Sequence, residues 1–172
     1  MLKILNKIRK IGVITEPAPT LAADHELDEL GFRVKKQIDR HFAGSFAIRA
    51  VDSGSCNACE LEIHALNNPV YDIERFGVHF VASPRHADAL LVTGGVSRHM
   101  ATALIRTWEA TPAPKWLIAM GDCAIDGGEF GSSYANMGGV SKILQPDVSI
   151  SGCPPTPELI LKAIYQLLQS SN

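Results

Sequence analysis

The sequence predicts an α/β domain with a doubly wound, mostly parallel five-stranded sheet that carries helices on both faces. Two observations predict this class. From residue 45 onward, short apolar runs alternate with helical patterns, which is the order that builds a parallel sheet. The runs at residues 89–92 (ALLV) and 116–120 (WLIAM) are apolar at every position, as in strands that are buried on both faces.

Composition narrows the classes of function. The 172 residues are 46% hydrophobic and 20% charged, which is typical of one soluble globular domain. A net charge of −2 gives no basic surface for nucleic acid, so we expect no nucleic-acid partner. No apolar run reaches the length of a membrane span, and the N-terminus lacks the pattern of a secretory signal. Four cysteines without an export signal indicate a reducing compartment and metal or redox use.

The first fourteen residues have an amphipathic pattern, in which isoleucines recur at helical spacing and lysines fall on another side. The residues concerned are Ile4, Ile8 and Ile11, and Lys3, Lys7 and Lys10. The pattern has two interpretations: a short basic helix on a membrane surface or a partner, or a terminus that packs locally or not at all. Residues 15–23 contain two prolines and predict a linker.

A second helical pattern follows the linker. Asp24 is a candidate N-cap, and we expect the helix to pause at Gly31. Val34, Ile38 and Phe42 then recur at spacing i, i+4, i+8, which gives one apolar stripe. We predict that residues 1–44 form a helical N-terminal extension that contacts a partner, and that residues 45–172 form the α/β domain.

The expected elements of that domain alternate along the chain. The strands are expected at 46–51, 77–82, 88–93, 115–120 and 147–151, and the helices at 58–66, 84–87 (a short turn), 97–110, 133–143 and 155–169. One sheet of five such strands with helices on both faces is a flavodoxin-like arrangement.

All four cysteines directly follow predicted strands. Cys56 and Cys59 form a C-x-x-C motif after the first strand, Cys123 follows the fourth strand, and Cys153 follows the fifth. Each has a glycine within a few residues before it. Ligands of open parallel sheets bind beyond the carboxyl ends of the strands. The four thiols are therefore expected to converge on one ligand at that edge.

Three kinds of ligand chemistry fit four thiols. Structural zinc sites usually bring their ligands in two local pairs, whereas here the ligands come as two, one and one, which favours an iron–sulfur cluster. A thioredoxin-like dithiol pair would leave Cys123 and Cys153 unexplained. Nearby glycines would let backbone N–H groups approach the sulfurs and help to set a redox potential. Zinc and unrelated buried thiols remain as alternatives.

Other motifs carry less chemistry. No glycine-rich dinucleotide or phosphate loop is present, and the six histidines show no ligand spacing. His64 is interpreted as a packing or surface residue. Glu60 adjoins Cys59, where a carboxylate beside a thiolate is electrostatically unfavourable. We expect Glu60 to face a polar channel or a partner, with a structural salt bridge as the alternative.

Three segments together resemble a known family. They are VDSGSCNACELEIHALNNPVYDIERFGVHFVASPRHADALLVTGGVSR, GDCAIDGGEFGSSYANMGG and SGCPPTPELIL. They resemble the small-subunit family shared by nickel–iron (NiFe) hydrogenases and respiratory complex I, where the member is the 20 kDa subunit. The resemblance covers roughly residues 45–169. Within the family, the chain is most similar to small subunits of group 4 membrane-bound hydrogenases, including the formate hydrogenlyase type.

Two departures from relatives support that placement. The complex I subunit carries two adjacent cysteines at the first ligand position, whereas Asn57 and Ala58 separate the pair here. Uptake-hydrogenase small subunits carry ligands for two more clusters and a twin-arginine export signal, and this sequence shows neither.

The resemblance implies a concrete function. Cys56, Cys59, Cys123 and Cys153 would bind one 4Fe-4S cluster, the proximal one, and this chain would contribute electron transfer. No catalytic residue is expected here, because the nickel–iron centre would lie in a separate large subunit; Glu60 is a candidate for a proton route. The other implied partners are a ferredoxin-like iron–sulfur subunit and an integral membrane subunit, with the complex on the cytoplasmic face of the cell membrane.

The resemblance also bears on two surface segments and on the alternatives. The basic N-terminal segment and the turn at residues 98–100 (RHM) are expected to face the membrane arm or a partner. The second hypothesis is a cluster-bearing quinone-reductase subunit of a complex I-like NADH dehydrogenase. The third, from another class, is a structural or assembly subunit that holds zinc or no metal.

Overall fold

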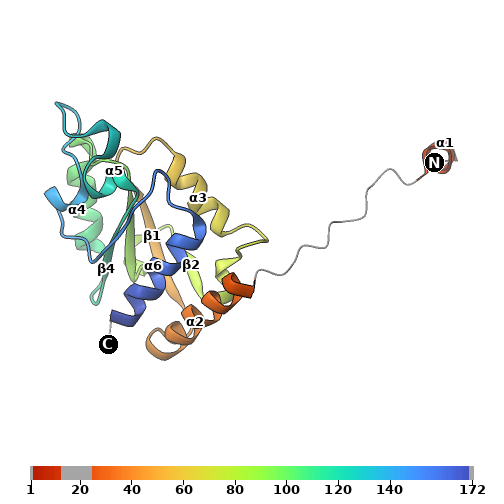
Figure 1. Ribbon diagram of the computed structural model, residues 1–172, viewed down its shortest axis with the longest axis horizontal. Helices are drawn as coiled ribbons and strands as arrows, with labels where there is room; N and C mark the ends of the chain where they lie inside the picture. Colours follow the sequence, from red (N-terminus) through yellow and green to blue (C-terminus); the bar gives the residue numbers. More distant parts are fainter. Residues whose placement is uncertain (1, 13–24, 171–172) are drawn as a thin grey trace.

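The fold is built on a five-stranded parallel sheet. A computed structural model describes residues 2–12 and 25–170. The strand order is β2-β1-β3-β4-β5, and every neighbouring pair is parallel (Figure 1). The strands are β1 (Phe46–Asp52), β2 (Val78–Phe80), β3 (Ala89–Thr93), β4 (Trp116–Met120) and β5 (Val148–Ile150). This is the flavodoxin-like order, so the predicted fold class is confirmed.

Helices cover both faces of the sheet. The α-helices are α1 (Leu2–Ile11), α2 (His25–His41), α3 (Ala58–Leu66), α4 (Arg98–Ala110), α5 (Asp122–Ile125) and α6 (Pro157–Ser170). Short 3₁₀ turns are η1 (Ile73–Phe76), η2 (Pro84–His86), η3 (Gly128–Phe130) and η4 (Val140–Lys142). On one face, α2, α3 and α6 pack into the larger hydrophobic core, and on the other α4, α5 and η4 pack into a second core.

The central strand β3 shows why its sequence is apolar throughout. Its side chains alternate between the faces: Leu91 lies in the core with α2, α3 and α6, while Leu90 and Val92 lie in the core with α4. All five β3 residues are buried. A continuous apolar run is therefore what a strand covered on both sides requires.

The α2 helix runs without a break through Gly31, so the predicted pause at this residue is wrong. Gly31 serves packing instead, because a Cβ at this position would lie 2.2 Å from the Phe76 ring of η1. Val34 and Ile38 are fully buried, which confirms the predicted apolar stripe. The candidate cap Asp24 and the linker at 15–23 lie outside the described residues.

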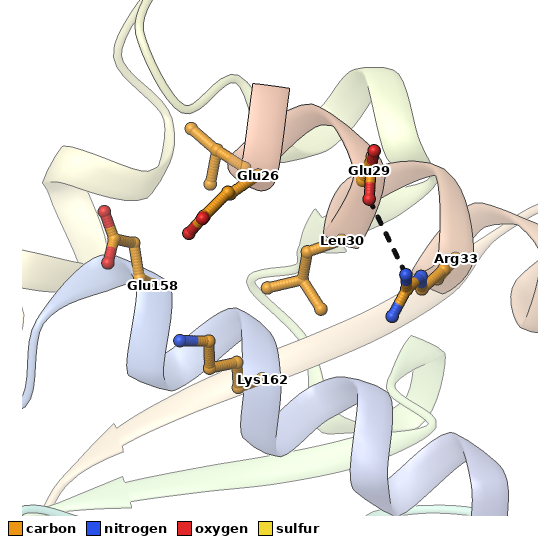
Figure 2. Close-up of a pocket in the computed structure, with 7 residues that line it drawn as sticks. Glu26, Glu29, Leu30, Arg33, Glu158 and Lys162 are labelled. Carbon is orange, nitrogen blue, oxygen red and sulfur yellow. Dashed lines mark ion pairs between the residues drawn. The ribbon is translucent and has the colours of Figure 1, made fainter. Parts of the chain in front are cut away.

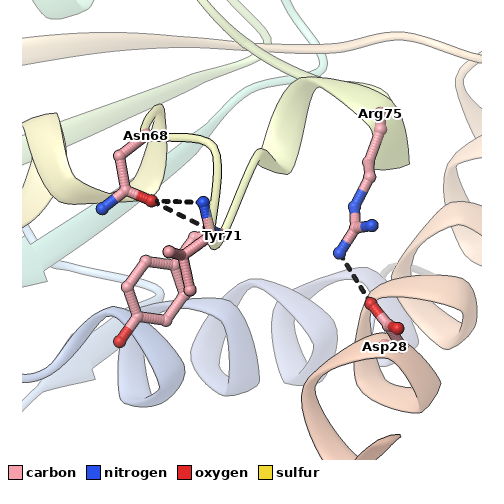
Figure 3. A network of polar contacts seen from close by, with 5 residues as sticks. Asp28, Asn68, Tyr71 and Arg75 are labelled. Carbon is pink, nitrogen blue, oxygen red and sulfur yellow. Dashed lines mark hydrogen bonds and ion pairs between the residues drawn. The ribbon is translucent and has the colours of Figure 1, made fainter. Parts of the chain in front are cut away.

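Polar contacts also fasten η1 to α2. The Arg75 guanidinium lies 2.6 Å from the Asp28 carboxylate on α2, and the Asn68 side-chain oxygen accepts hydrogen bonds from the backbone N–H groups of Val70 and Tyr71 (Figure 3). Because α2 shares its core with the sheet, it packs against the α/β domain. The functional boundary between residues 44 and 45 stays a prediction.

The predicted helix at residues 133–143 is wrong. Within this range only η4 is helical, and the rest is irregular. Gly138 has a φ of +93°, which is unfavourable in a right-handed helix. At Gly139, a Cβ would lie 2.0 Å from the Ile125 carbonyl oxygen. The glycine pair therefore lets this segment pack against α5, which sequence reasoning did not anticipate.

Candidate functional site: a four-thiol pocket

The four cysteines line one pocket at the carboxyl edge of the sheet. Cys56 lies in the loop after β1, Cys59 in the first turn of α3, Cys123 in the first turn of α5, and Cys153 after β5. Three separate loops thus bring these thiols together, as the parallel topology predicts. Gly94, Gly121 and Gly152 also line this pocket.

The loop that carries Cys56 is shaped by side-chain to backbone hydrogen bonds. The Asp52 carboxylate at the end of β1 accepts from the N–H groups of Gly54 at 2.9 Å and Ser55 at 2.7 Å, which is a typical Asx turn. The Ser55 hydroxyl accepts from the N–H of Asn57, whose φ is +74°. This turn starts α3 at residue 58 and leaves Cys56 exposed while Cys59 is buried.

Glu60 fastens this loop to the neighbouring strand. One carboxylate oxygen accepts a hydrogen bond from the Ser55 hydroxyl at 2.7 Å, and the other accepts from the Thr93 hydroxyl at the end of β3. Both carboxylate oxygens are therefore engaged by hydroxyl groups. No ion pair of Glu60 occurs within residues 25–170, and the expected polar channel stays a prediction.

The protein surroundings disfavour thiolates in the metal-free site. Burial, followed by the charge on Glu60 and the neighbouring thiols, raises the pKa of Cys59 from 9.0 to about 12. Burial also raises the pKa of Cys123. Because ligand sulfurs must be deprotonated, a bound cation would have to supply the compensating charge.

Backbone contacts brace the loops that carry Cys123 and Cys153. The Asp122 N–H donates to the Gly152 carbonyl at 3.0 Å, and the Gly152 N–H donates back to the Asp122 carboxylate at 2.8 Å. Glycine is needed beside the sulfurs: a Cβ at Gly121 would lie 2.7 Å from Cys59 Sγ, and one at Gly128 would lie 2.9 Å from Cys123 Sγ. These glycines keep space open around the thiols.

The donor set fits a thiolate-bound metal group. Four cysteine sulfurs on one pocket are the ligand set of iron–sulfur clusters and of some zinc sites. Within the described part of the chain, no group of three or more His, Cys, Asp or Glu side chains is arranged to hold a metal ion.

Other candidate residues lie outside the four-thiol pocket. His64 is exposed on α3, which agrees with its interpretation as a surface residue. Arg98 and His99 are exposed at the start of α4, and the Arg98 side chain donates to the Tyr134 carbonyl at 2.6 Å. Whether this turn faces a partner stays a prediction.

A separate pocket between α2 and α6 was not anticipated. Glu26, Glu29 and Arg33 of α2 line it opposite Glu158 and Lys162 of α6, and Arg33 lies 3.6 Å from Glu29 (Figure 2). Its charges are mixed and exposed, and it shares no lining residue with the four-thiol pocket.

A parallel α/β fold with four thiols at the ligand edge of its sheet defines the class of this chain. Comparison with known proteins then gives the family. Residues 56–167 match the family described as "NADH ubiquinone oxidoreductase, 20 Kd subunit". The chain belongs to this family, whose members are subunits of oxidoreductase complexes. The resemblance predicted from the sequence is confirmed.

Relatives within the family have different names. The chain is 43% identical over 145 residues to formate hydrogenlyase subunit 7 of Escherichia coli, which covers 84% of this chain and 55% of the relative. It is 49% identical over 112 residues to an NADH-quinone oxidoreductase subunit of Akkermansia muciniphila, which covers 64% of this chain and 58% of the relative. The chain thus spans a little over half the length of these relatives.

A solved structure shows the same fold. In the membrane-bound sulfane sulfur reductase, an archaeal respiratory membrane complex, one chain superposes with a TM-score of 0.66 at 33% identity. The match covers 79% of this chain and 74% of that one. Within the described residues, no helix is both long enough and apolar enough to span a membrane.

Proposed function

We propose that this chain is the electron-transfer subunit of a membrane-bound NiFe hydrogenase complex. In this proposal Cys56, Cys59, Cys123 and Cys153 hold one 4Fe-4S cluster, the proximal one. The observation that carries the proposal is that these four thiols, from three strand ends, line one pocket. Bound there, such a cluster supplies one-electron transfer.

The chain's own residues would set the environment of that cluster. Cys59 is buried and Cys56 and Cys153 are exposed, so one side of the site faces the protein and the other faces outward. The exposed side is where electrons would enter or leave through a partner. The inner side is shielded by apolar neighbours, which tune a potential through burial.

The proposed partners follow from the family. They are a large subunit with the nickel–iron centre, a ferredoxin-like iron–sulfur subunit and an integral membrane subunit, on the cytoplasmic face of the cell membrane. The relative named as a formate hydrogenlyase subunit supports this assignment. So does the two-residue gap between Cys56 and Cys59, because the complex I subunit carries adjacent cysteines.

Electron paramagnetic resonance of the reduced, anaerobically purified complex tests the cluster. We expect an iron–sulfur signal from this subunit that is lost when Cys123 is replaced by alanine. Zinc in place of iron by metal analysis, with no such signal, would exclude the cluster and favour a structural subunit.

A complex I-like quinone-reductase subunit is the second candidate, favoured by the relative named as an NADH-quinone oxidoreductase subunit. Hydrogen evolution with reduced viologen by the intact complex separates the two. NADH-dependent quinone reduction without hydrogen evolution would select the second.

Glu60 is proposed as part of a proton route. The Glu60→Gln variant removes the ionisable proton but keeps a side chain of the same shape. Unchanged hydrogen evolution by this variant would remove Glu60 from the route.

A further inference from the structure

The α1 helix has an apolar face that the rest of the described chain does not bury. It contains no buried residue, and Figure 1 shows it apart from the α/β domain. Five aliphatic side chains are each between 51% and 78% exposed. They are Leu2, Ile4, Leu5, Ile8 and Ile11.

These aliphatic residues share one side of the helix. At 3.6 residues per turn, all five fall within about half of the circumference. Lys3, Lys7 and Lys10 occupy the opposite side, and Arg9 lies at the edge of the apolar face. Long basic side chains at such an edge can lay their aliphatic stems along apolar surface while the charge stays in water.

The α2 helix provides the contrast within the same chain. It is also amphipathic, but its apolar stripe at Val34 and Ile38 is fully buried in the core. It also carries acidic residues in its first turn, whereas α1 has none. The α1 pattern is therefore not a general property of helices in this protein.

Charge separates α1 from the rest of the molecule. Four Lys and Arg residues and no Asp or Glu give α1 a formal charge of +4. Because the whole chain carries −2, the other residues together carry −6. A helix that is basic on one face and aliphatic on the other matches a surface that is anionic outside and hydrocarbon inside.

We propose that α1 lies in the plane of an anionic membrane surface, with Ile4, Ile8 and Ile11 inserted and the lysines toward lipid phosphates. The inference does not rest on the proposed hydrogenase function, because it uses only α1 and its charge. A single helix of this length binds weakly and reversibly on its own. In an assembled complex, α1 would add to other attachments through high effective concentration.

Flotation of the full chain with vesicles tests the proposal. We expect binding to mixed phosphatidylglycerol and phosphatidylcholine vesicles, and much weaker binding to phosphatidylcholine alone or at high salt. Lys7→Gln should lower partitioning about fivefold, since one Lys near an anionic surface contributes about 1 kcal/mol. Ile8→Ser should lower it about tenfold or more, because an inserted aliphatic side chain is lost.

Matched controls lie elsewhere on the surface. Val70 is 59% exposed, close to the 60% of Ile8, and Lys36 is an exposed base on α2. Val70→Ser and Lys36→Gln should leave vesicle binding unchanged. All four substitutions are at exposed positions, so circular dichroism should show the same fold as the original chain.

Two results would overturn the proposal. One is equal binding to neutral and anionic vesicles, or binding to neither. The other comes from a photoreactive side chain at position 8 in the intact, vesicle-reconstituted complex. Crosslinks to lipid are expected, and crosslinks to another subunit would show that α1 docks on protein.

Discussion

Glu60 illustrates how much of the site depends on one side chain that is not a ligand. Its carboxylate accepts hydrogen bonds from Ser55 in the ligand loop and from Thr93 on β3. Glu60→Ala would remove both bonds and leave two hydroxyl groups without this acceptor, at a cost of about 1–3 kcal/mol. We expect less iron and acid-labile sulfide per chain in the purified complex, measured by chemical analysis.

The control for this prediction is on the same helix. Glu62 is half-buried on α3, and Glu62→Ala should leave the iron content unchanged. Glu60→Gln should retain most of the iron, because a rotated hydroxyl can donate to or accept from an amide. Equal iron in Glu60→Ala and the original protein would show that these hydrogen bonds do not hold the ligand loop.

Thiol reactivity gives a second prediction at the scale of residues. The thiolate is the reactive form, and the pKa of Cys59 is raised to about 12 by burial. In the metal-free chain near pH 8, we expect Cys56 and Cys153 to react with iodoacetamide first and Cys59 last. Mass spectrometry of the labelled peptides measures the order. Cys59 labelling should rise with pH up to about 12, and similar rates for all four thiols in native buffer would contradict the folded pocket.

The ligand residues were easier to predict than the residues that position them. Cysteines after strands are a strong signal, because few other residue types bind metals through sulfur. Asp52, Ser55 and Thr93 gave no such signal, since their roles depend on contacts between separate strands. The sequence Asp-Ser-Gly-Ser at residues 52–55 could have indicated the Asx turn from its side-chain oxygen two residues before glycine.

At the scale of elements, α2 depends on a small residue under a ring. Gly31→Ala would normally stabilise a helix by about 1 kcal/mol. Here the new Cβ would lie 2.2 Å from the Phe76 ring, which is 1% exposed and cannot move freely. Overpacking of this kind costs about 1–3 kcal/mol. We therefore expect a lower melting temperature by thermal unfolding.

A second substitution checks the cause. In Phe76→Leu the ring is absent, so adding Gly31→Ala to that variant should be neutral or stabilising. A double-mutant cycle would then give a coupling between the two positions. If Gly31→Ala lowers the melting temperature equally in both backgrounds, the ring is not the reason that residue 31 is glycine.

Strands and long helices were predictable because their periodicity is local. The error at residues 133–143 arose because Gly139 faces the Ile125 carbonyl of α5, a contact that spacing along the chain cannot reveal. The same holds for Gly31, whose reason is a ring from η1. Glycine in a helical pattern has two meanings, a break or a close approach, and only tertiary contacts decide between them.

At the scale of the whole molecule, the parallel topology is what makes the site predictable. Distant cysteines converge because every strand of the sheet ends at the same edge. The exposed aliphatic face of α1 could be anticipated only in part: Ile4, Ile8 and Ile11 were expected on one side, whereas Leu2 and Leu5 join that face as well. Sequence spacing alone does not say whether such a face is covered by the rest of the chain.

The same topology makes a prediction about metal removal. A group bound by Cys56, Cys59, Cys123 and Cys153 would tie three loops together, and binding to the folded state alone stabilises that state. Removing iron with an oxidant and chelator should therefore raise amide exchange about tenfold or more in the loops at 53–57, 121–128 and 151–155. Strand β3 and helix α6 should stay protected, because their buried side chains form the cores. Hydrogen exchange with mass spectrometry measures this pattern, and Cys153→Ala should reproduce it without the chelator. A uniform rise over all elements would mean that the metal holds the whole fold, and no change at all would mean that the four thiols do not bind a shared group.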